Sequence, residues 1–90
     1  MKDWIIGICN TAADGVTILR ARGTDDEIRT LLFKLVQEDK EADEDGWDYG
    51  TESVEDVQWA GFHELYAYGV YYDYHIDYTA REFANVEWAE

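Results

Sequence analysis

Apolar side chains recur every three to four positions between Thr24 and residue 41, and this period predicts an amphipathic α-helix. Thr24 and Glu27 have the spacing of a capping box, in which each side chain bonds the backbone amide of the other residue. We therefore expect the helix to begin there. Neither proline nor glycine interrupts residues 24–45, so the helix is expected to end near Glu41. The apolar stripe consists of Ile28, Leu31, Leu32, Leu35 and Val36.

The stretch before this helix predicts a β-hairpin. Residues 3–10 are rich in β-branched and aromatic side chains, and residues 16–22 alternate between two faces. Asp14 and Gly15 favour the positive φ angles that a tight hairpin turn requires, so residues 11–15 are expected to join the two strands.

Residues 64–78 alternate with period two and are rich in tyrosine, which again predicts a strand. This stretch exceeds the usual length of a single strand. We expect a tight turn near residues 72–74 that divides it into two strands, with one long, bulged strand as the alternative. The tail, residues 80–90, fits either a helix or a strand, and both interpretations stay open.

A second capping box, Ser53 to Asp56, predicts a short helix that ends near Ala60. The order is then strand, strand, helix, loop, strand, strand. This order predicts the α+β class, with an antiparallel sheet of three to four strands and one amphipathic helix packed on one face. Tyrosines are expected to hold the opposite face of the sheet. The length of 90 residues predicts a single domain, residues 1–90.

The formal net charge of −14 narrows the range of partners. Nucleic acids and anionic membranes would be repelled, so neither is expected to bind directly. Hydrophobic residues make up 47% of the chain, which argues against disorder throughout. The single cysteine, Cys9, excludes an internal disulfide and is expected to be a small buried side chain in a cytoplasmic protein. No segment predicts a membrane span or a signal peptide.

Negative charge is concentrated in residues 38–56, where ten of nineteen residues are acidic and Lys40 is the single base. A compact domain of this length is about 30 Å across, and a DNA duplex of that length carries about 18 phosphate charges. The charge of this chain therefore approaches that of a duplex and exceeds the roughly 2–8 units that solubility requires.

These acids, together with two neighbouring aromatic residues, predict a surface for a basic, nucleic-acid-binding protein. Trp47 and Tyr49 are expected to be exposed anchors within the acidic rim, as is Trp59. The predicted partner-binding residues are Glu38, Asp39, Glu41, Asp43, Glu44, Asp45, Trp47, Asp48, Tyr49, Glu52, Glu55 and Asp56.

Two other patterns suggest metal or acid–base chemistry. Residues 41–52 partly match an EF-hand calcium loop, but Glu41 replaces the first aspartate and Asp48 replaces the usual apolar residue. Asp73, His75 and Asp77 share one face of a straight strand, but His63 lies across a loop from them. We expect a solvated acidic loop and a surface row, with no metal, no cofactor and no enzymatic activity.

In size, charge and compact α+β pattern, with the acidic run Glu38–Asp56, the chain resembles the small acidic DNA-mimic proteins of phages and mobile elements. That class includes anti-restriction and anti-CRISPR inhibitors. The resemblance implies a non-enzymatic inhibitor that occupies the nucleic-acid channel of a defence nuclease. It carries over no individual functional residue, because the members share no diagnostic motif.

A second hypothesis is a generic interaction domain that uses its tyrosine-rich sheet face, with Tyr68, Tyr72 and Tyr74, to contact a partner or a second copy of itself. Such a domain would permit a homodimer. The two hypotheses differ in their dependence on salt, because only the acidic surface relies on charge.

Overall fold

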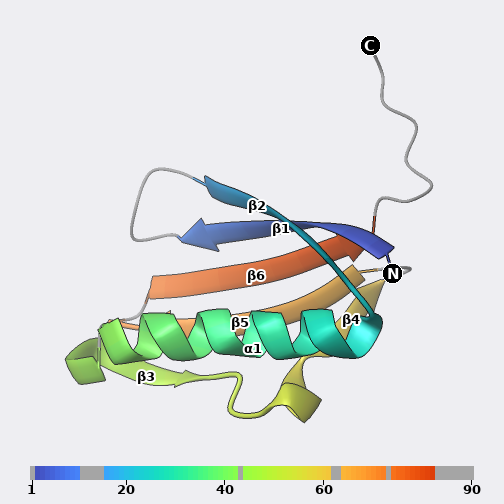
Figure 1. Ribbon diagram of the computed structural model, residues 1–90. Coiled ribbons are helices and arrows are strands. Elements are labelled where there is room, and N and C mark those ends of the chain that lie inside the picture. Colours follow the sequence, from blue (N-terminus) through green and yellow to red (C-terminus); the bar gives the residue numbers. More distant parts are fainter. Residues whose placement is uncertain (1, 11–15, 43, 62–63, 73, 83–90) are drawn as a thin grey trace.

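The computed structural model describes residues 2–10, 16–42, 44–61, 64–72 and 74–82. One helix lies across one face of a six-stranded sheet in which every pairing is antiparallel (Figure 1). The predicted α+β class, with one helix packed on an antiparallel sheet, is confirmed. The elements are β1 (Lys2–Asn10), β2 (Val16–Gly23), α1 (Asp25–Ala42), the 3-10 turn η1 (Glu44–Gly46), β3 (Trp47–Gly50), the 3-10 turn η2 (Val54–Asp56), β4 (Gln58–Gly61), β5 (Glu64–Tyr71) and β6 (Tyr74–Glu82).

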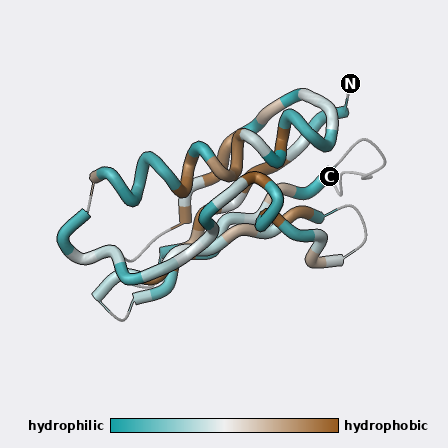
Figure 2. The backbone as a smooth tube through the Cα atoms, turned by 90° about the horizontal axis from the view of Figure 1, so that it is seen from below, coloured by the Kyte–Doolittle hydropathy of each residue, from teal (hydrophilic) through white to brown (hydrophobic). Residues whose placement is uncertain are grey.

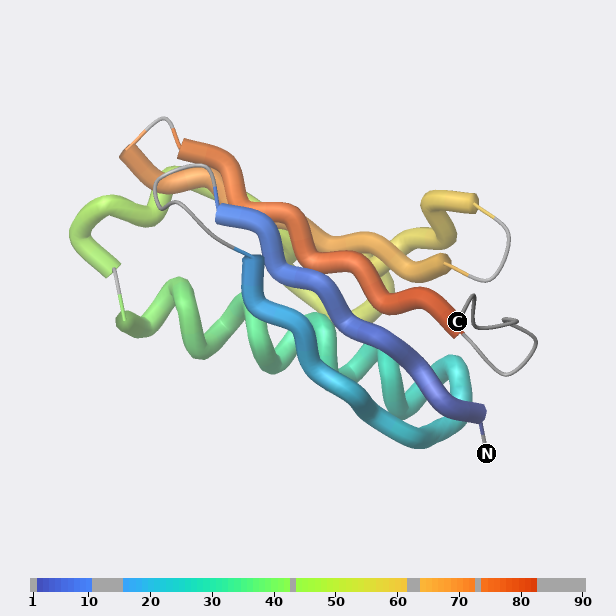
Figure 3. Tube along the Cα trace, turned by 90° about the horizontal axis from the view of Figure 1, so that it is seen from above, coloured from blue at the N-terminus to red at the C-terminus, as the bar shows by residue number. Residues whose placement is uncertain are grey.

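The strand order is β2-β1-β6-β5-β3, and β4 also pairs with β5. Figure 3 shows β2, β1, β6 and β5 side by side, with β2 outermost. The prediction of three to four strands was wrong, because β3 and β4 are only four residues long and show no extended alternation. Both strands gain their order from pairing with β5, which is a tertiary contact that local periodicity does not reveal.

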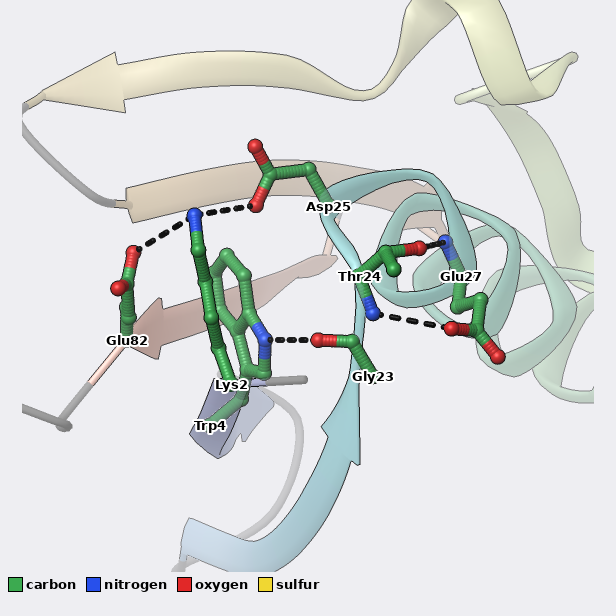
Figure 4. Close-up of polar contacts among 7 residues, drawn as sticks. All are labelled: Lys2, Trp4, Gly23, Thr24, Asp25, Glu27 and Glu82. Atoms are coloured by element: carbon green, nitrogen blue, oxygen red, sulfur yellow. Dashed lines mark hydrogen bonds and ion pairs between the residues drawn. The ribbon is translucent and has the colours of Figure 1, made fainter.

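The predicted capping box is present at the start of α1 (Figure 4). The Thr24 amide donates to Glu27 Oε1 at 3.0 Å, and the Glu27 amide donates to Thr24 Oγ1 at 3.3 Å. The helix begins at Asp25 and ends at Ala42, close to both predicted ends.

The same end of the helix is tied to the sheet by β1. Trp4 Nε1 donates to the carbonyl oxygen of Gly23 at 3.1 Å, where β2 passes into the helix. Lys2 Nζ lies 3.2 Å from Asp25 Oδ1 and 3.5 Å from Glu82 Oε2, so one ammonium group links the helix to β6. These contacts fix the angle at which the helix leaves the hairpin.

The core lies between α1 and the sheet. Ile28, Leu32 and Val36 are the buried residues of the helix, and Leu31 and Leu35 pack partly buried against the same cluster. Figure 2 shows hydrophobic and hydrophilic positions alternating along the helix, which lies over the strands. The sheet contributes Trp4, Ile6, Leu65, Ala67, Ile76, Tyr78 and Ala80, and Val57 enters the core from the segment between η2 and β4.

The predicted turn between two tyrosine-rich strands is confirmed. β5 ends at Tyr71, β6 begins at Tyr74, and these two residues pair across the turn. Tyr72 has φ 46°, a left-handed conformation that a tight turn requires and that a side chain tolerates poorly. Its amide donates to the carbonyl oxygen of Gly46 at 3.0 Å, which connects the turn to η1.

The turn changes which positions face the helix. In β5 the odd-numbered Leu65 is buried, whereas in β6 the even-numbered Tyr78 is buried. Tyrosines therefore do not all share the open face as predicted: Tyr66 and Tyr68 lie there, and Tyr78 lies in the core. Cys9, expected to be buried, is exposed near the end of β1.

The helix predicted from Ser53 to Ala60 is not present. The Ser53 side chain makes no capping hydrogen bond, the 3-10 turn ends at Asp56, and the chain then forms β4. Asp56 accepts instead from the Glu52 amide at 3.2 Å. A continuing helix would remove Val57 from the core and β4 from β5, and these two contacts stop it after a single turn. In the tail, Ala80 to Glu82 belong to β6, and residues 83–90 lie outside the described part of the chain.

Candidate functional site: an acidic edge

The end of α1, η1, β3 and η2 lie along one side of the molecule (Figure 1), and these elements carry a series of exposed acidic residues. In Figure 2 the chain from the end of α1 through η1 is mainly hydrophilic. β3 lies at the opposite edge of the sheet from β2. We call this surface the acidic edge. Its exposed members are Glu38, Glu41, Glu44, Asp45, Asp48, Glu52, Glu55 and Asp56.

The chain that carries these acids is anchored to the sheet in the middle. Thr51 follows β3 and is buried. Its amide donates to the Tyr68 carbonyl oxygen at 2.9 Å, and its hydroxyl accepts from the Tyr68 amide at 3.1 Å. These two bonds continue the pairing of β3 with β5 by one residue before the chain turns away from the sheet.

A second anchor lies beyond η2. Val57 is fully buried, and its carbonyl oxygen accepts a 2.7 Å hydrogen bond from Arg29 Nη1 on the helix. The Arg29 guanidinium also lies 5.7 Å from the centre of the Trp59 ring, within the range of a cation–π contact. Residues 52–56 therefore form a short excursion whose two ends are fixed, and we call this segment the excursion.

Two of the predicted binding residues have structural roles. Asp39 accepts a hydrogen bond from the hydroxyl of the buried Tyr78. Trp47 stacks on Tyr71 and covers Gly69, where an added Cβ would lie only 2.1 Å from Trp47 Cη2. Trp47 is thus packed against the core, contrary to the expectation that it would be an exposed anchor. Asp43, the remaining predicted acid, lies outside the described residues.

Two aromatic residues at this edge are exposed as predicted. Tyr49 is 58% exposed and its ring meets that of Tyr68 edge-on, at 6.4 Å between ring centres. Trp59 is 45% exposed and lies beside Arg29. Tyr49 lies next to Asp48 on β3, so a large partly apolar side chain is placed within the row of carboxylates.

A hollow of about 270 Å³ lies where the excursion leaves the sheet. Its lining combines two acidic residues, Glu52 and Asp56, with two aromatic residues, Tyr66 and Tyr68. Such a combination suits the cationic end of a lysine or arginine side chain. The lining residues are Gly50, Thr51, Glu52, Asp56, Gln58, Tyr66 and Tyr68.

The open face of the sheet carries a compact polar cluster next to this hollow. The Tyr66 hydroxyl donates to Asp77 Oδ1 at 2.6 Å, and His75 Nε2 lies 2.8 Å from the same oxygen. The Tyr68 ring lies nearly parallel to the rings of Tyr66 and His75, at centre-to-centre distances of 6.1 and 5.7 Å, and the Tyr66 hydroxyl lies 3.3 Å from His75 Nε2. Burial, followed by the hydrogen bond to Asp77, raises the pKa of Tyr66 above its ordinary value, so Tyr66 remains a neutral donor.

Neither metal pattern forms a ligand set among the residues that the structure describes, where no three His, Cys, Asp or Glu side chains are placed to hold a metal ion. The partial calcium motif, residues 41–52, folds largely as the end of α1, η1 and β3. His75 and Asp77 do share a face, as predicted, while Asp73 and His63 lie outside the described residues.

Sequence reasoning found the acids but missed the residues that hold them. Thr51, Val57 and Arg29 gave no local signal, because their roles depend on contacts with β5 and α1. The sequence indicates that Tyr68 belongs to a tyrosine-rich strand, but it does not indicate that Tyr68 forms hydrogen bonds with Thr51 in the acidic run.

Comparison with protein-family models, curated proteins and solved structures found no match to this chain. Within the described ranges, the helix is too short or too polar to cross a membrane.

Proposed function

We propose that this protein is a non-enzymatic binder of basic, nucleic-acid-binding proteins, and that it inhibits a phage or host defence nuclease by imitating a nucleic acid. The observation that carries the proposal is the anchoring of the acidic edge. Its charges are displayed on a helix end, a paired strand and an excursion fixed by Thr51 and Val57. A surface that is already ordered loses little conformational entropy when it binds.

The charge density of the edge supports imitation of one nucleic-acid strand. The molecule is 41 Å long, and one strand of a duplex of that length carries about 12 phosphates at one per 3.4 Å. The acidic edge presents eight exposed carboxylates within this length, before Asp43 is counted. A groove lined by lysine and arginine would therefore meet a comparable number of negative charges whether it binds a nucleic-acid strand or the acidic edge of this protein.

The parts of the edge suit different steps of association. Clustered charge accelerates encounter with a basic groove, and counterions released from both surfaces favour the complex. The hollow beside Glu52 and Asp56 receives a cationic side chain. Tyr49 supplies the aromatic anchor that a row of carboxylates lacks.

The tyrosine-rich sheet face is the second candidate surface. No described element covers it, and it presents the rings of Tyr66, Tyr68 and His75 as one cluster. The polar groups of Tyr66, His75 and Asp77 already bond one another, which lowers their gain from a polar partner. We therefore favour the acidic edge as the primary surface.

The test uses two variants of equal net charge. Glu44→Gln, Asp45→Asn and Glu52→Gln together remove three charges from the acidic edge, which gives −14 + 3 = −11. The control combines Asp26→Lys and Thr30→Lys on exposed positions of the helix, and also gives −14 + 2 + 1 = −11. Each variant is titrated against a panel of purified restriction endonucleases and RNA-guided nucleases, with DNA cleavage and direct binding as readouts.

We expect the unmodified chain to inhibit at least one nuclease, with excess duplex DNA relieving inhibition. The edge variant should bind about tenfold or more weakly, since each exposed pair contributes roughly 0.5 kcal/mol or more. The control should bind nearly as well as the unmodified chain, and affinity should fall steeply with salt. Absence of binding across the panel, or equal weakening by both variants, would refute the proposal.

A further inference from the structure

The outer edge of β2 is the regular edge of this sheet. All of its residue pairs with β1 follow one register without a bulge, from Lys2 with Gly23 to Cys9 with Val16. Among the described residues, no strand pairs with its outer side. Edge strands of monomeric proteins are usually protected by charged side chains, by proline, by bulges or by short length. β2 has eight residues and only two charged side chains, both near its end, so its first half carries none of these protections.

Apolar side chains are concentrated on this same strand. Val16 is 61% exposed, Ile18 is 69% exposed and Leu19 is 39% exposed. Val16 and Ile18 lie on the open face of the sheet, while Leu19 faces the helix side, because Leu19 pairs with the buried Ile6. An unpaired backbone edge with apolar residues on both faces is the surface to which another strand adds most readily.

A groove accompanies the edge on the helix side. β2 ends at Gly23 and α1 begins at Asp25, so the helix starts beside the end of β2, whereas the first five residues of β2 are exposed. The groove has a volume of about 540 Å³. It is lined by Ile8, Asn10, Val16, Thr17, Leu19, Leu35, Asp39 and Ile76.

The distribution of charge identifies the occupant of this edge. β2 contains Arg20 and Arg22 and no acidic residue, although the whole chain carries a net charge of −14. Arg22 is partly neutralised within the chain by Asp3, at 2.9 Å. Two copies of so acidic a chain repel each other least when their β2 edges meet, because the acidic edges then point away from each other.

We propose that this chain forms a two-fold symmetric dimer in which β2 pairs antiparallel with β2 of a second copy. Pairing centred on Leu19 places the two Leu19 side chains against each other over the grooves. It also sets Ile18 beside Arg20 of the second copy, and Val16 beside Arg22. Each guanidinium then lies next to an apolar side chain whose surface its methylene stem covers, and no two arginines are directly opposed.

The dimer goes beyond the proposed function, and its stability should depend on salt in the opposite direction to the binding of a basic partner by the acidic edge. Added salt screens repulsion between two negatively charged copies and strengthens the dimer, whereas it weakens binding of the acidic edge to a basic partner. Sedimentation velocity at 0.05 and 0.5 M NaCl therefore separates the two interactions. The expected species has twice the mass of one chain and a smaller dissociation constant at the higher salt.

Two variants test the surface. Ile18→Lys places a cation beside Arg20 of the second copy and removes apolar contact twice, so the dimer dissociation constant should rise about 100-fold. Tyr49→Lys is the matched control at an exposed residue of the other edge, and should leave the dimer intact while weakening nuclease binding. Thermal unfolding of each variant establishes that it is folded.

Crosslinking tests the register independently of any loss of fold. Single cysteines are placed at residues 17, 18, 19 and 20 in a Cys9→Ser background, because Cys9 is exposed. Disulfide-linked dimers should form fastest with Leu19→Cys, since only a residue opposite its own copy meets the distance limits of a disulfide. A chain that stays monomeric at millimolar concentration in 0.5 M NaCl, a dimer indifferent to Ile18→Lys, or crosslinking without preference for residue 19 would each overturn the proposal.

Discussion

A single hydrogen bond between Tyr78 and Asp39 connects the middle of the sheet to the last turn of the helix. The sequence placed Tyr78 on a tyrosine-rich face and Asp39 among partner-binding acids. The alternation of buried positions shifts at the β5–β6 turn, so Tyr78 lies in the core. Asp39 is then engaged by the Tyr78 hydroxyl and does not serve as a free partner-binding acid. Trp47 was wrongly predicted to be an exposed anchor for a similar reason. Its ring packs over Gly69, and this contact depends on the pairing of β3 with β5.

At this scale we predict that Tyr78→Phe destabilises the protein by about 1–2 kcal/mol, because the bond to a carboxylate is lost from a buried site. Urea unfolding monitored by circular dichroism measures the change. Tyr49→Phe is the control, since Tyr49 is largely exposed, and it should change stability by less than about 0.5 kcal/mol. Equal effects of the two substitutions would contradict a structural role for the Tyr78 hydroxyl.

Alkaline pH should act through the same residue. Burial, followed by the hydrogen bond to Asp39, raises the pKa of Tyr78 above the ordinary value of about 10. Below that value Tyr78 is neutral in both the folded and unfolded chain, so its contribution to stability is fully present. As pH rises further, the unfolded chain ionises first and stability falls. The decline above pH 10, followed by tyrosinate absorbance and unfolding, should be shallower in Tyr78→Phe.

Elements with their own sequence signals were predicted well. The helix has a capping box, an apolar stripe and no interruption, and the β1–β2 hairpin has two regular strands. The two short strands at the other edge, β3 and β4, were not predicted, because each pairs with β5 over only three residue positions and each pairing contains a register shift. Their order comes from Thr51 and Val57, whose partners are distant in the sequence.

For the helix we predict that Thr24→Ala costs about 1 kcal/mol of stability, since the Glu27 amide loses its acceptor. Thr30→Ala is a matched control in the same helix, because Thr30 is exposed and its hydroxyl bonds the Asp26 carbonyl oxygen without capping the helix. Alanine has the higher helix propensity, so this control should be neutral or slightly stabilising. Thermal unfolding of both variants measures the change in stability. A larger loss of stability with Thr30→Ala than with Thr24→Ala would exclude the capping role of Thr24.

Across the whole molecule, charge is distributed unevenly. The acidic edge holds eight exposed carboxylates, and the opposite edge strand, β2, holds two arginines and no acid. The sequence predicted the acidic run and its size. It did not reveal that the run follows a single side of the fold, because that arrangement requires β3 and β4 to share one partner strand.

Crowded negative charge should weaken the folded state at low salt. We predict that raising NaCl from 0.05 to 0.5 M increases the midpoint of thermal unfolding by about 5 °C, which corresponds to roughly 1 kcal/mol for a domain of this size. Measurement in the Ile18→Lys background removes any contribution from dimerisation. The edge variant Glu44→Gln, Asp45→Asn, Glu52→Gln should show a smaller increase, and an equal increase would mean that the acidic edge is not the main source of repulsion.

A sheet with one regular edge and one broken edge can be extended from one side only. Register shifts after Trp47 and Trp59, together with the excursion between them, leave the β3–β4 side without a straight row of backbone groups for an incoming strand. Carboxylates along that side repel a further chain as well. Strand addition at β2 therefore ends with two copies and does not propagate into a fibre, so a protein with an apolar, unprotected strand is still kept from amyloid-like growth.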